Sequence, residues 1–245
     1  MESKRVQFFL WHFFISIFIA VISLLWIFSV WYPNPLAKAT NVTHIFLMLL
    51  TIDVILGPLL GFLVYKENKK TLKFDLGVIF LLQFSALIYG IYSISQARPS
   101  WIAYNVDRFE LIRVKDIITD NIEKASPQYQ NISWLKPKFV GVQVSKNNEE
   151  KNQNMFEEIL GGISIAQRPE RYVELKQVKD QIQQRVQDLK QLIQFNESSQ
   201  VESILKKYPR ANAWVPLKAN AIDMVVLINK ESAEVVKIVD LRPWN

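Results

Sequence analysis

Three long apolar runs fill the first part of the chain, and polar segments separate them. The runs cover about 11–32, 42–65 and 74–95. Each is long enough for the roughly 20 apolar residues that a helix needs to cross a bilayer. The pattern therefore predicts a membrane domain of three transmembrane helices at 1–97, followed by a single soluble domain at 98–245.

The first run begins after Lys4 and Arg5 and ends before two prolines, which cannot continue a helix. A cleaved signal peptide is the alternative interpretation, because Ala37-Lys38-Ala39 resembles a cleavage site. The run is longer than the roughly 7–15 apolar residues of a signal peptide, which favours a retained anchor. In either case the residues after the run face the same side of the membrane.

The charges of the connecting loops predict how the helices are oriented. The loop KENKKTLK holds four Lys against one Glu, whereas 33–41 holds only Lys38. Positive charge beside membrane helices marks the cytoplasmic side. We therefore expect the amino terminus and the Lys-rich loop in the cytoplasm and the outer domain on the other side. Arg98, Arg108 and Arg113, which follow the third run, argue mildly for the reverse.

Asp53 lies near the middle of the second run. A charge at that depth costs about 2.5–3.5 kcal/mol on insertion scales. We expect its side chain to form a hydrogen bond that holds the helices together, with Ser23 and Gln83 at a similar depth. His12 and His44 are expected near the two ends of their helices, away from Asp53. A binding face for another membrane helix is the alternative, and a proton relay would need several titratable groups in series.

Small residues recur at helical spacing in the second and third runs. The sequence GPLLG places Gly57 and Gly61 four residues apart, and Ala86 and Gly90 repeat this spacing. Small side chains at such a spacing let helix backbones approach closely. Pro58 is expected to bend the second helix, because its ring interrupts the hydrogen-bond ladder. The pattern predicts close packing of the three helices, with docking of a foreign helix as the alternative.

The second part of the chain combines strand and helix patterns. Strands are predicted in SWIAYN, FELIRV and KFVGVQVS, and a hairpin is predicted to pair 224–228 with 235–240. Apolar residues recur every three or four positions from Pro169 to Phe195, which predicts one long amphipathic helix. A coiled-coil seam is the alternative for that helix, although it covers only about three heptads. With a further helix at 200–207, the outer domain is predicted to be α+β with an antiparallel sheet.

Composition limits the chemistry of the chain. It has no Cys, and the segment 98–245 has no His. This removes thiol nucleophiles, imidazole bases and most transition-metal sites from the outer domain. Phosphate-binding and nucleophile-elbow motifs are absent, and no base-reading motif accompanies the net charge of +6. We therefore expect no enzymatic activity, cofactor, metal, nucleic-acid partner or small-molecule substrate.

Five strings of the chain resemble the type IV pilin accessory proteins of the TfpX/TfpZ family: DVILGPLLGFLVYK, LKFDL, YGIYSISQARPSWIAYNVDRFELI, IAQRPERY and DLRPW. The resemblance covers nearly the whole chain and is densest from Asp53 to Ile112. It implies a multi-pass protein of the inner membrane of a Gram-negative bacterium, with the outer domain in the periplasm. It also implies the major type IV pilin as a partner, with the pilus assembly platform and membrane lipid as further candidates. It brings no catalytic residues.

Two groups of residues are expected to carry this function. The first, a helix-docking or packing face, comprises Asp53, Gly57, Pro58, Gly61, Gln83, Ala86 and Gly90. The second, a membrane-to-domain junction that orients the outer domain, comprises Arg98, Pro99, Asp107 and Arg108. A membrane-bound sensor or regulator with an extracytoplasmic domain is the alternative function, and a glycosyltransferase acting on pilin is another. The short cytoplasmic segments argue against the first of these, and the lack of an acid/base motif argues against the second.

Overall fold

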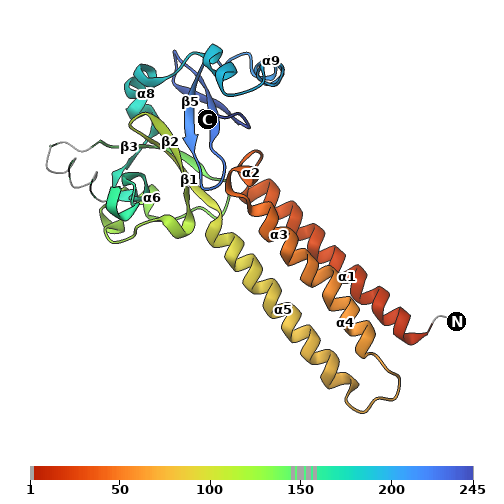
Figure 1. The fold of residues 1–245 in the computed structure, drawn as a ribbon. Helices are drawn as coiled ribbons and strands as arrows, with labels where there is room; N and C mark the ends of the chain where they lie inside the picture. Colours follow the sequence, from red (N-terminus) through yellow and green to blue (C-terminus); the bar gives the residue numbers. More distant parts are fainter. Residues whose placement is uncertain (1–2, 145–146, 148–151, 153–155, 157–158, 245) are drawn as a thin grey trace.

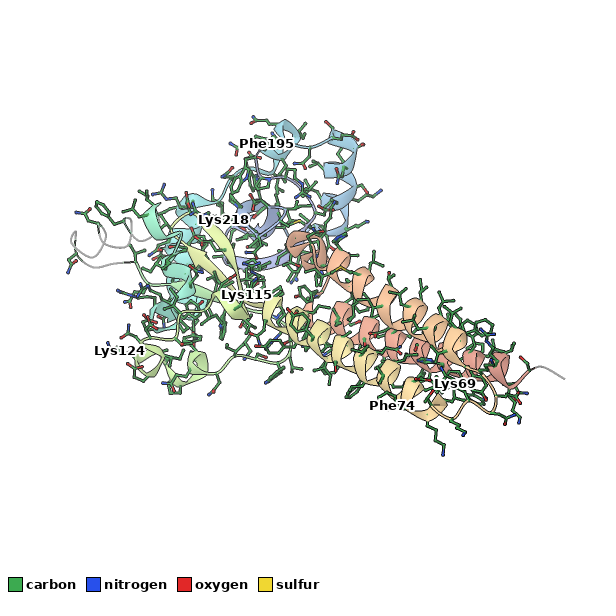
Figure 2. The ribbon with its side chains drawn as sticks, turned by 60° about the horizontal axis from the view of Figure 1, so that its bottom comes forward. Lys69, Phe74, Lys115, Lys124, Phe195 and Lys218 are labelled. Carbon is green, nitrogen blue, oxygen red and sulfur yellow. The ribbon has the colours of Figure 1, made fainter. Side chains whose placement is uncertain are left out.

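The computed structural model describes residues 3–144, 147, 152, 156 and 159–244. Three long helical segments lie side by side and project from a sheet domain at one end (Figure 1). Lys69 and Phe74 lie at the end of the helices that is farthest from the sheet (Figure 2). The Lys-rich loop and the sheet domain are therefore at opposite ends of the helical part.

Within the described residues, three helical segments are long and apolar enough to cross a membrane: Lys4–Trp31, Val42–Val64 and Leu72–Ala97. Their elements are α1 (Lys4–Trp26) with a π-helical turn (Ile27–Trp31); α3 (Val42–Leu50), a π-helical turn (Thr51–Leu56) and α4 (Gly57–Val64); and α5 (Leu72–Ala97). Large apolar side chains such as Trp11, Phe74 and Tyr89 are exposed on their outer faces. The three predicted helices are present, and a π-helical turn interrupts the second.

The segment between the first two helices folds back onto the sheet domain. Its short helix α2 (Leu36–Thr40) buries Leu36 and Ala39 in the same apolar cluster as residues of the sheet. The Ala39 carbonyl oxygen accepts a hydrogen bond of 3.0 Å from the backbone N–H of Ala221. Lys38 Nζ lies 2.6 Å from Asp240 Oδ2. The helical part and the sheet domain therefore share a packed interface.

A seven-stranded mixed sheet forms among the described residues, in the order β4-β3-β1-β2-β5-β6-β7. The strands are β1 (Pro99–Asn105), β2 (Arg108–Arg113), β3 (Lys138–Val142), β4 (Tyr172–Val173), β5 (Ala213–Lys218), β6 (Met224–Asn229) and β7 (Glu234–Val239). The β1–β3 and β2–β5 pairs are parallel, so the prediction of an antiparallel sheet is wrong for these two. Parallel neighbours arise because the chain leaves the β1–β2 hairpin, adds β3 beside β1, and returns much later to add β5 beside β2.

Both faces of the sheet are buried, because successive residues of a strand point to opposite sides. In β6, Met224 and Val226 belong to the apolar cluster that includes α2, whereas Val225 and Leu227 belong to a cluster on the other face. A strand that is covered on both faces is apolar throughout, as the sequence MVVLI shows. The predicted strands in SWIAYN and FELIRV and the predicted C-terminal hairpin are confirmed. Of the strand predicted in KFVGVQVS, Lys138–Val142 is confirmed, and Ser145 lies outside the described residues.

The long amphipathic helix predicted from Pro169 to Phe195 is wrong. The chain there forms 3₁₀ turns at Pro169–Arg171, Leu175–Val178 and Leu189–Gln194, strand β4, and only one short α-helix, α8 (Lys179–Arg185). Besides these local turns, part of the backbone bonds to the sheet. β4 pairs with β3, and Gln187 exchanges two backbone hydrogen bonds with Trp214, of 2.8 and 3.0 Å. The apolar spacing indicated burial correctly at most positions but not at Ile193, which is exposed, and tertiary pairing overrides a weak helix preference.

Other short elements complete the domain. They are α6 (Pro127–Gln130), α9 (Ser198–Lys207), and 3₁₀ turns at Val114–Asp116, Ile122–Lys124 and Ile165–Gln167. The helix α9 confirms the one expected at 200–207. It buries Val201 against the face of the sheet that carries Trp214, beside Leu192.

Asp188 begins the last 3₁₀ turn of the broken segment. Its Oδ1 accepts a hydrogen bond of 2.8 Å from the Lys190 N–H, and its carbonyl oxygen accepts one of 2.9 Å from Trp214 Nε1. We expect Asp188→Ala to lower the free energy of unfolding by about 1 kcal/mol, the usual loss for a capping side chain. Thermal unfolding measures this, with Glu202→Ala on the exposed face of α9 as the control. Equal stability of the two variants would show that the capping side chain does not contribute.

Candidate functional site

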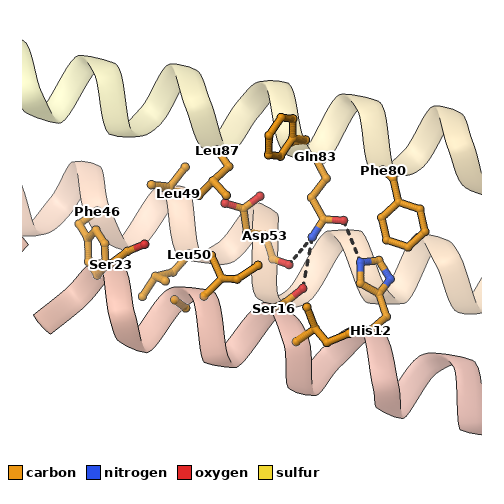
Figure 3. Close-up of a pocket in the computed structure, with 14 residues that line it drawn as sticks. His12, Ser16, Ser23, Phe46, Leu49, Leu50, Asp53, Phe80, Gln83 and Leu87 are labelled. Atoms are coloured by element: carbon orange, nitrogen blue, oxygen red, sulfur yellow. Dashed lines mark hydrogen bonds between the residues drawn. The ribbon is translucent and has the colours of Figure 1, made fainter. Parts of the chain in front are cut away.

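A pocket of about 140 Å³ opens between the three long helices at the level of Asp53. Most of its walls are apolar side chains of α1, α3 and α5. Figure 3 shows the polar groups that interrupt these walls: His12, Ser16 and Ser23 of α1, Asp53 of the π-helical turn, and Gln83 of α5. Ser23 and Gln83 were the predicted neighbours of Asp53, and both line this pocket.

Gln83 links all three helices through its side-chain amide. Its Oε1 lies 2.9 Å from His12 Nε2, and its Nε2 donates to the Asp53 backbone carbonyl at 2.7 Å and to Ser16 Oγ at 3.4 Å. Because an amide oxygen can only accept, His12 Nε2 is the donor in this arrangement. A hydrogen bond that holds the helices together is therefore present. Its centre is Gln83, and Asp53 takes part through its backbone.

The local sequence explains why the Asp53 carbonyl is free to accept. In a π-helical turn, backbone hydrogen bonds join residues five apart. The Gly57 N–H accordingly donates to the Ile52 carbonyl. The matching donor for the Asp53 carbonyl would be residue 58, which is proline and has no N–H. Gln83 supplies the donor that Pro58 lacks.

The Asp53 carboxylate is buried without a hydrogen bond. The residue is 7% exposed, and neither carboxylate oxygen has a partner among the described residues. Figure 3 shows the carboxylate beside Leu49 and Leu87, away from the amide of Gln83. An unpaired carboxylate in such surroundings is costly. The expectation that Asp53 faces the other helices is right, but its carboxylate does not make the predicted bond between them.

The small residues of the second helix face other helices of the same chain. Gly57, Pro58 and Gly61 are all buried. A Cβ atom on Gly57 would overlap the carboxamide of Gln83, and one on Gly61 would lie 3.0 Å from Phe8 Cε1. The geometry thus gives both glycines a packing role inside the chain. Docking of a foreign helix on them stays a prediction.

Ala86 and Gly90, the small residues of α5, are half-buried. A Cβ atom on Gly90 would collide with the Leu49 side chain of α3. The absence of a side chain at this position lets α3 and α5 approach closely.

His12 belongs to the site, although the sequence analysis placed it away from Asp53. It is 6% exposed and lines the same pocket, and its ring centroid lies 4.8 Å from that of Phe80. Ser16 was not singled out at all. A signal was available, because His12, Ser16 and Ser23 recur at intervals of four and seven on one face of α1. The sequence analysis estimated the depth of His12 by counting residues from the end of its apolar run. This count ignores how far neighbouring helices are shifted along one another.

Arg98 lies where α5 passes into the sheet, and it is 2% exposed. Its Nη1 donates to the Ser95 carbonyl at 2.8 Å, and its Nη2 donates to the Ser133 carbonyl at 3.0 Å. The guanidinium carbon lies 4.7 Å from the ring centroid of Trp134 and 5.7 Å from that of Trp31. Burial lowers the pKa of the Arg98 guanidinium, which nevertheless stays charged. Backbone carbonyls and aromatic faces hold this cation at the junction.

Two of the four predicted junction residues lie elsewhere. Pro99 begins β1 and pairs with Arg113 of β2, so it lies beside Arg98 at the junction. β1 then runs away from the helices, and the chain turns back just before β2 starts at Arg108. Asp107 and Arg108 are therefore at the far end of the β1–β2 hairpin. The junction role that was expected of them is wrong, because the hairpin returns to the helices only at Arg113.

The pocket combines hydrogen-bonding groups with apolar walls. Within the part of the chain that the structure describes, no group of three or more His, Cys, Asp or Glu residues is placed to hold a metal ion. The polar groups of the pocket are the Asp53 carboxylate, Gln83 with its partners His12 and Ser16, and the Ser23 hydroxyl. The remaining walls are apolar. A pocket of this kind suits a ligand that presents one polar group on an otherwise apolar segment.

Comparison with known proteins identifies relatives. The family model described as "Fimbrial assembly protein FimB" matches residues 3–40. Two fimbrial assembly proteins of Dichelobacter nodosus, of serogroups I and E1, are each 28% identical over 228 residues, which cover 89% of this chain and 88% of theirs. A third, of serogroups C1 and C2, is 34% identical over 116 residues, which cover 46% of this chain and 88% of that protein. No solved structure matches this chain significantly.

Proposed function

Because the chain belongs to the fimbrial assembly protein family, we propose that it is a non-enzymatic accessory protein of the inner membrane. In this proposal it supports the assembly or dynamics of type IV pili by contacting the major pilin. The observation that carries the proposal is the similarity, over 89% of the chain, to relatives that are named fimbrial assembly proteins. The sequence resemblance to type IV pilin accessory proteins points to the same function.

The proposed topology places the membrane domain at 1–97 and the periplasmic domain at 98–245. The amino terminus and the loop between α4 and α5 are on the cytoplasmic side. The positive charge of that loop supports this orientation, because Lys69 lies at the end of the helices that is opposite to the sheet, and Lys70 and Lys73 follow it in the sequence.

The architecture suits a partner that is itself partly in the membrane. A pilin with an apolar helix in the bilayer and a head in the periplasm could be contacted at both levels. The three helices have exposed apolar faces and enclose the Asp53 pocket, and in this proposal both would face such a helix. Arg98 and the Lys38–Asp240 ion pair fix the sheet domain relative to the helices. In this proposal Gly57, Pro58 and Gly61 shape the pocket, with Asp53 facing the partner.

A clean deletion of the gene tests this function. We expect pilin sheared from the cell surface to fall several-fold while total-cell pilin holds, because an assembly factor acts after pilin is made. Immunoblots of sheared and total pilin measure both quantities. The same comparison with a non-cognate pilin, swapped into the deletion strain, tests whether the pairing is specific.

The other possible outcomes would each indicate a different role for the protein. If total pilin falls together with surface pilin, the protein protects pilin in the membrane. If neither changes for any pilin, the accessory function is wrong, and a sensor or regulator becomes the better proposal.

A further inference from the structure

The chain provides hydrogen-bond partners for a buried carboxylate in its sheet domain but not for Asp53. Glu110 is 5% exposed, and its Oε1 accepts a hydrogen bond of 2.9 Å from Asn105 Nδ2 and lies 3.5 Å from Arg108 Nε. Asp53 is buried to a similar extent, and the described residues offer its carboxylate oxygens no donor. A binding partner from outside the chain would resolve this difference.

The surroundings of Asp53 also lack a compensating charge. None of the described residues that line the pocket is Lys or Arg. The Gln83 amide is already engaged with His12, Ser16 and the Asp53 backbone. A Cβ atom on Gly61 would lie 3.3 Å from His12 Nδ1, so this nitrogen faces the second helix at Gly61. Because no described residue pairs with the Asp53 carboxylate, a ligand that carries a positive charge or a donor would supply the partner that it lacks.

The shape of the pocket limits what that ligand can be. A cavity of about 140 Å³ is close to the roughly 150 Å³ of engineered cavities that hold one benzene molecule. It has room for one side chain, and its apolar walls suit an aliphatic stem. Asp53 lies in the middle of the Val42–Val64 segment, far from both helix ends. A lipid headgroup stays at the surface of a bilayer, so a side chain carried on a membrane helix reaches this depth more readily.

We propose that the pocket binds a primary ammonium group at the end of a short aliphatic stem, supplied by a partner's membrane helix, with the Asp53 carboxylate as its counter-charge. The identity of this partner rests on the proposed function, whereas the ligand chemistry rests on the pocket alone. Burying both charges together removes the cost of leaving either one unpaired in an apolar environment.

Purified protein in neutral detergent tests the ligand chemistry without any pilus component. The probe is n-butylamine, which reproduces the side chain of lysine and is protonated at neutral pH, and 1-butanol is its uncharged counterpart. We expect n-butylamine at ten times its Kd to raise the Tm by roughly 3–6 °C. 1-Butanol at the same concentration should not raise it. The Asp53→Asn variant should lose the difference between the two probes.

Two further variants keep the test decisive. Asp75→Asn is the matched control, because this carboxylate is already paired with Lys69 at 2.7 Å and should leave the n-butylamine effect unchanged. Ser23→Leu fills the pocket from α1 and leaves Asp53 in place, so it should abolish the effect even if Asp53→Asn does not fold. Equal shifts with amine and alcohol, or an amine shift that survives in Asp53→Asn or in Ser23→Leu, would overturn the proposal. A failed amine test combined with a pilus defect in the deletion strain would reject the ligand and leave the proposed function standing.

Discussion

Gly57→Leu is expected to unfold the three-helix part under conditions in which the parent chain stays folded. The first atom of the new side chain overlaps the Gln83 carboxamide. Gln83 must then leave its position, so the Asp53 carbonyl loses its donor and α5 loses its bonds to His12 and Ser16. Overpacking and the lost bonds between helices together should cost roughly 2–4 kcal/mol. Loss of helical circular dichroism during titration with a denaturing detergent measures this cost.

The matched control is Gly77→Leu in α5. Gly77 is exposed and nothing lies within 4 Å of a Cβ atom there, so a side chain at this position starts in open space. Leucine is the better helix former by about 0.8 kcal/mol, and this control should therefore be neutral or slightly stabilising. If the two variants unfold at the same detergent fraction, the close approach of Gly57 to Gln83 does not contribute to the fold.

Arg98→Ala is expected to release the segment around Ser133 and Trp134 from the end of the helices. Two backbone carbonyls lose a charged donor, and two tryptophan rings lose the guanidinium that lies against them. Hydrogen bonds from a charged group contribute about 1.5–3 kcal/mol each, so we expect a loss of roughly 3 kcal/mol in the free energy of unfolding. Thermal unfolding measures the loss. Faster chymotrypsin cleavage after Trp134 reports the release of the segment.

Two companion variants separate charge from geometry at Arg98. Arg98→Lys keeps the charge but lacks the planar fork that reaches two carbonyls at once, so it should recover only part of the stability. Lys136→Ala removes an exposed charge nearby and should change stability by less than about 0.5 kcal/mol. Cleavage of Arg98→Ala at the rate of the parent would show that other contacts hold the segment, among them the 2.9 Å hydrogen bond from Trp31 Nε1 to the Trp134 carbonyl.

The three long apolar helices could be predicted because the length and composition of an apolar run are local properties of the sequence. The π-helical turn at Thr51–Leu56 could not, since its cause is a combination of Pro58 with a donor that arrives from another helix. The same limit applies to His12. Its place in the pocket depends on how far α1 is shifted along α5, and this shift cannot be predicted from the sequence of either helix alone.

In the sheet domain, local patterns located the strands but not their order. The run MVVLI identified β6, yet nothing in β1 indicates that β3 will pair with it in parallel. The segment before Phe195 shows the opposite failure. Most of its predicted apolar face is buried or half-buried, although Ile193 is exposed, and long-range bonds such as those between Gln187 and Trp214 replace part of the predicted helix. Long-range pairing of this kind is the part of a fold that a single sequence leaves undetermined.

The position of α2 has a consequence for the order in which the protein is made. Lys38 bonds to Asp240, 202 residues later in the chain. At a synthesis rate of 5–20 residues per second, that partner leaves the ribosome roughly 10–40 s after α2 does. Until the last strands arrive, the sheet that covers Leu36 and Ala39 is incomplete, because Met224, Val226 and Ile238 belong to the same apolar cluster. The nascent chain thus passes through a stage in which apolar residues of α2 are not yet fully covered. A chaperone or protease would bind the chain most easily during that stage.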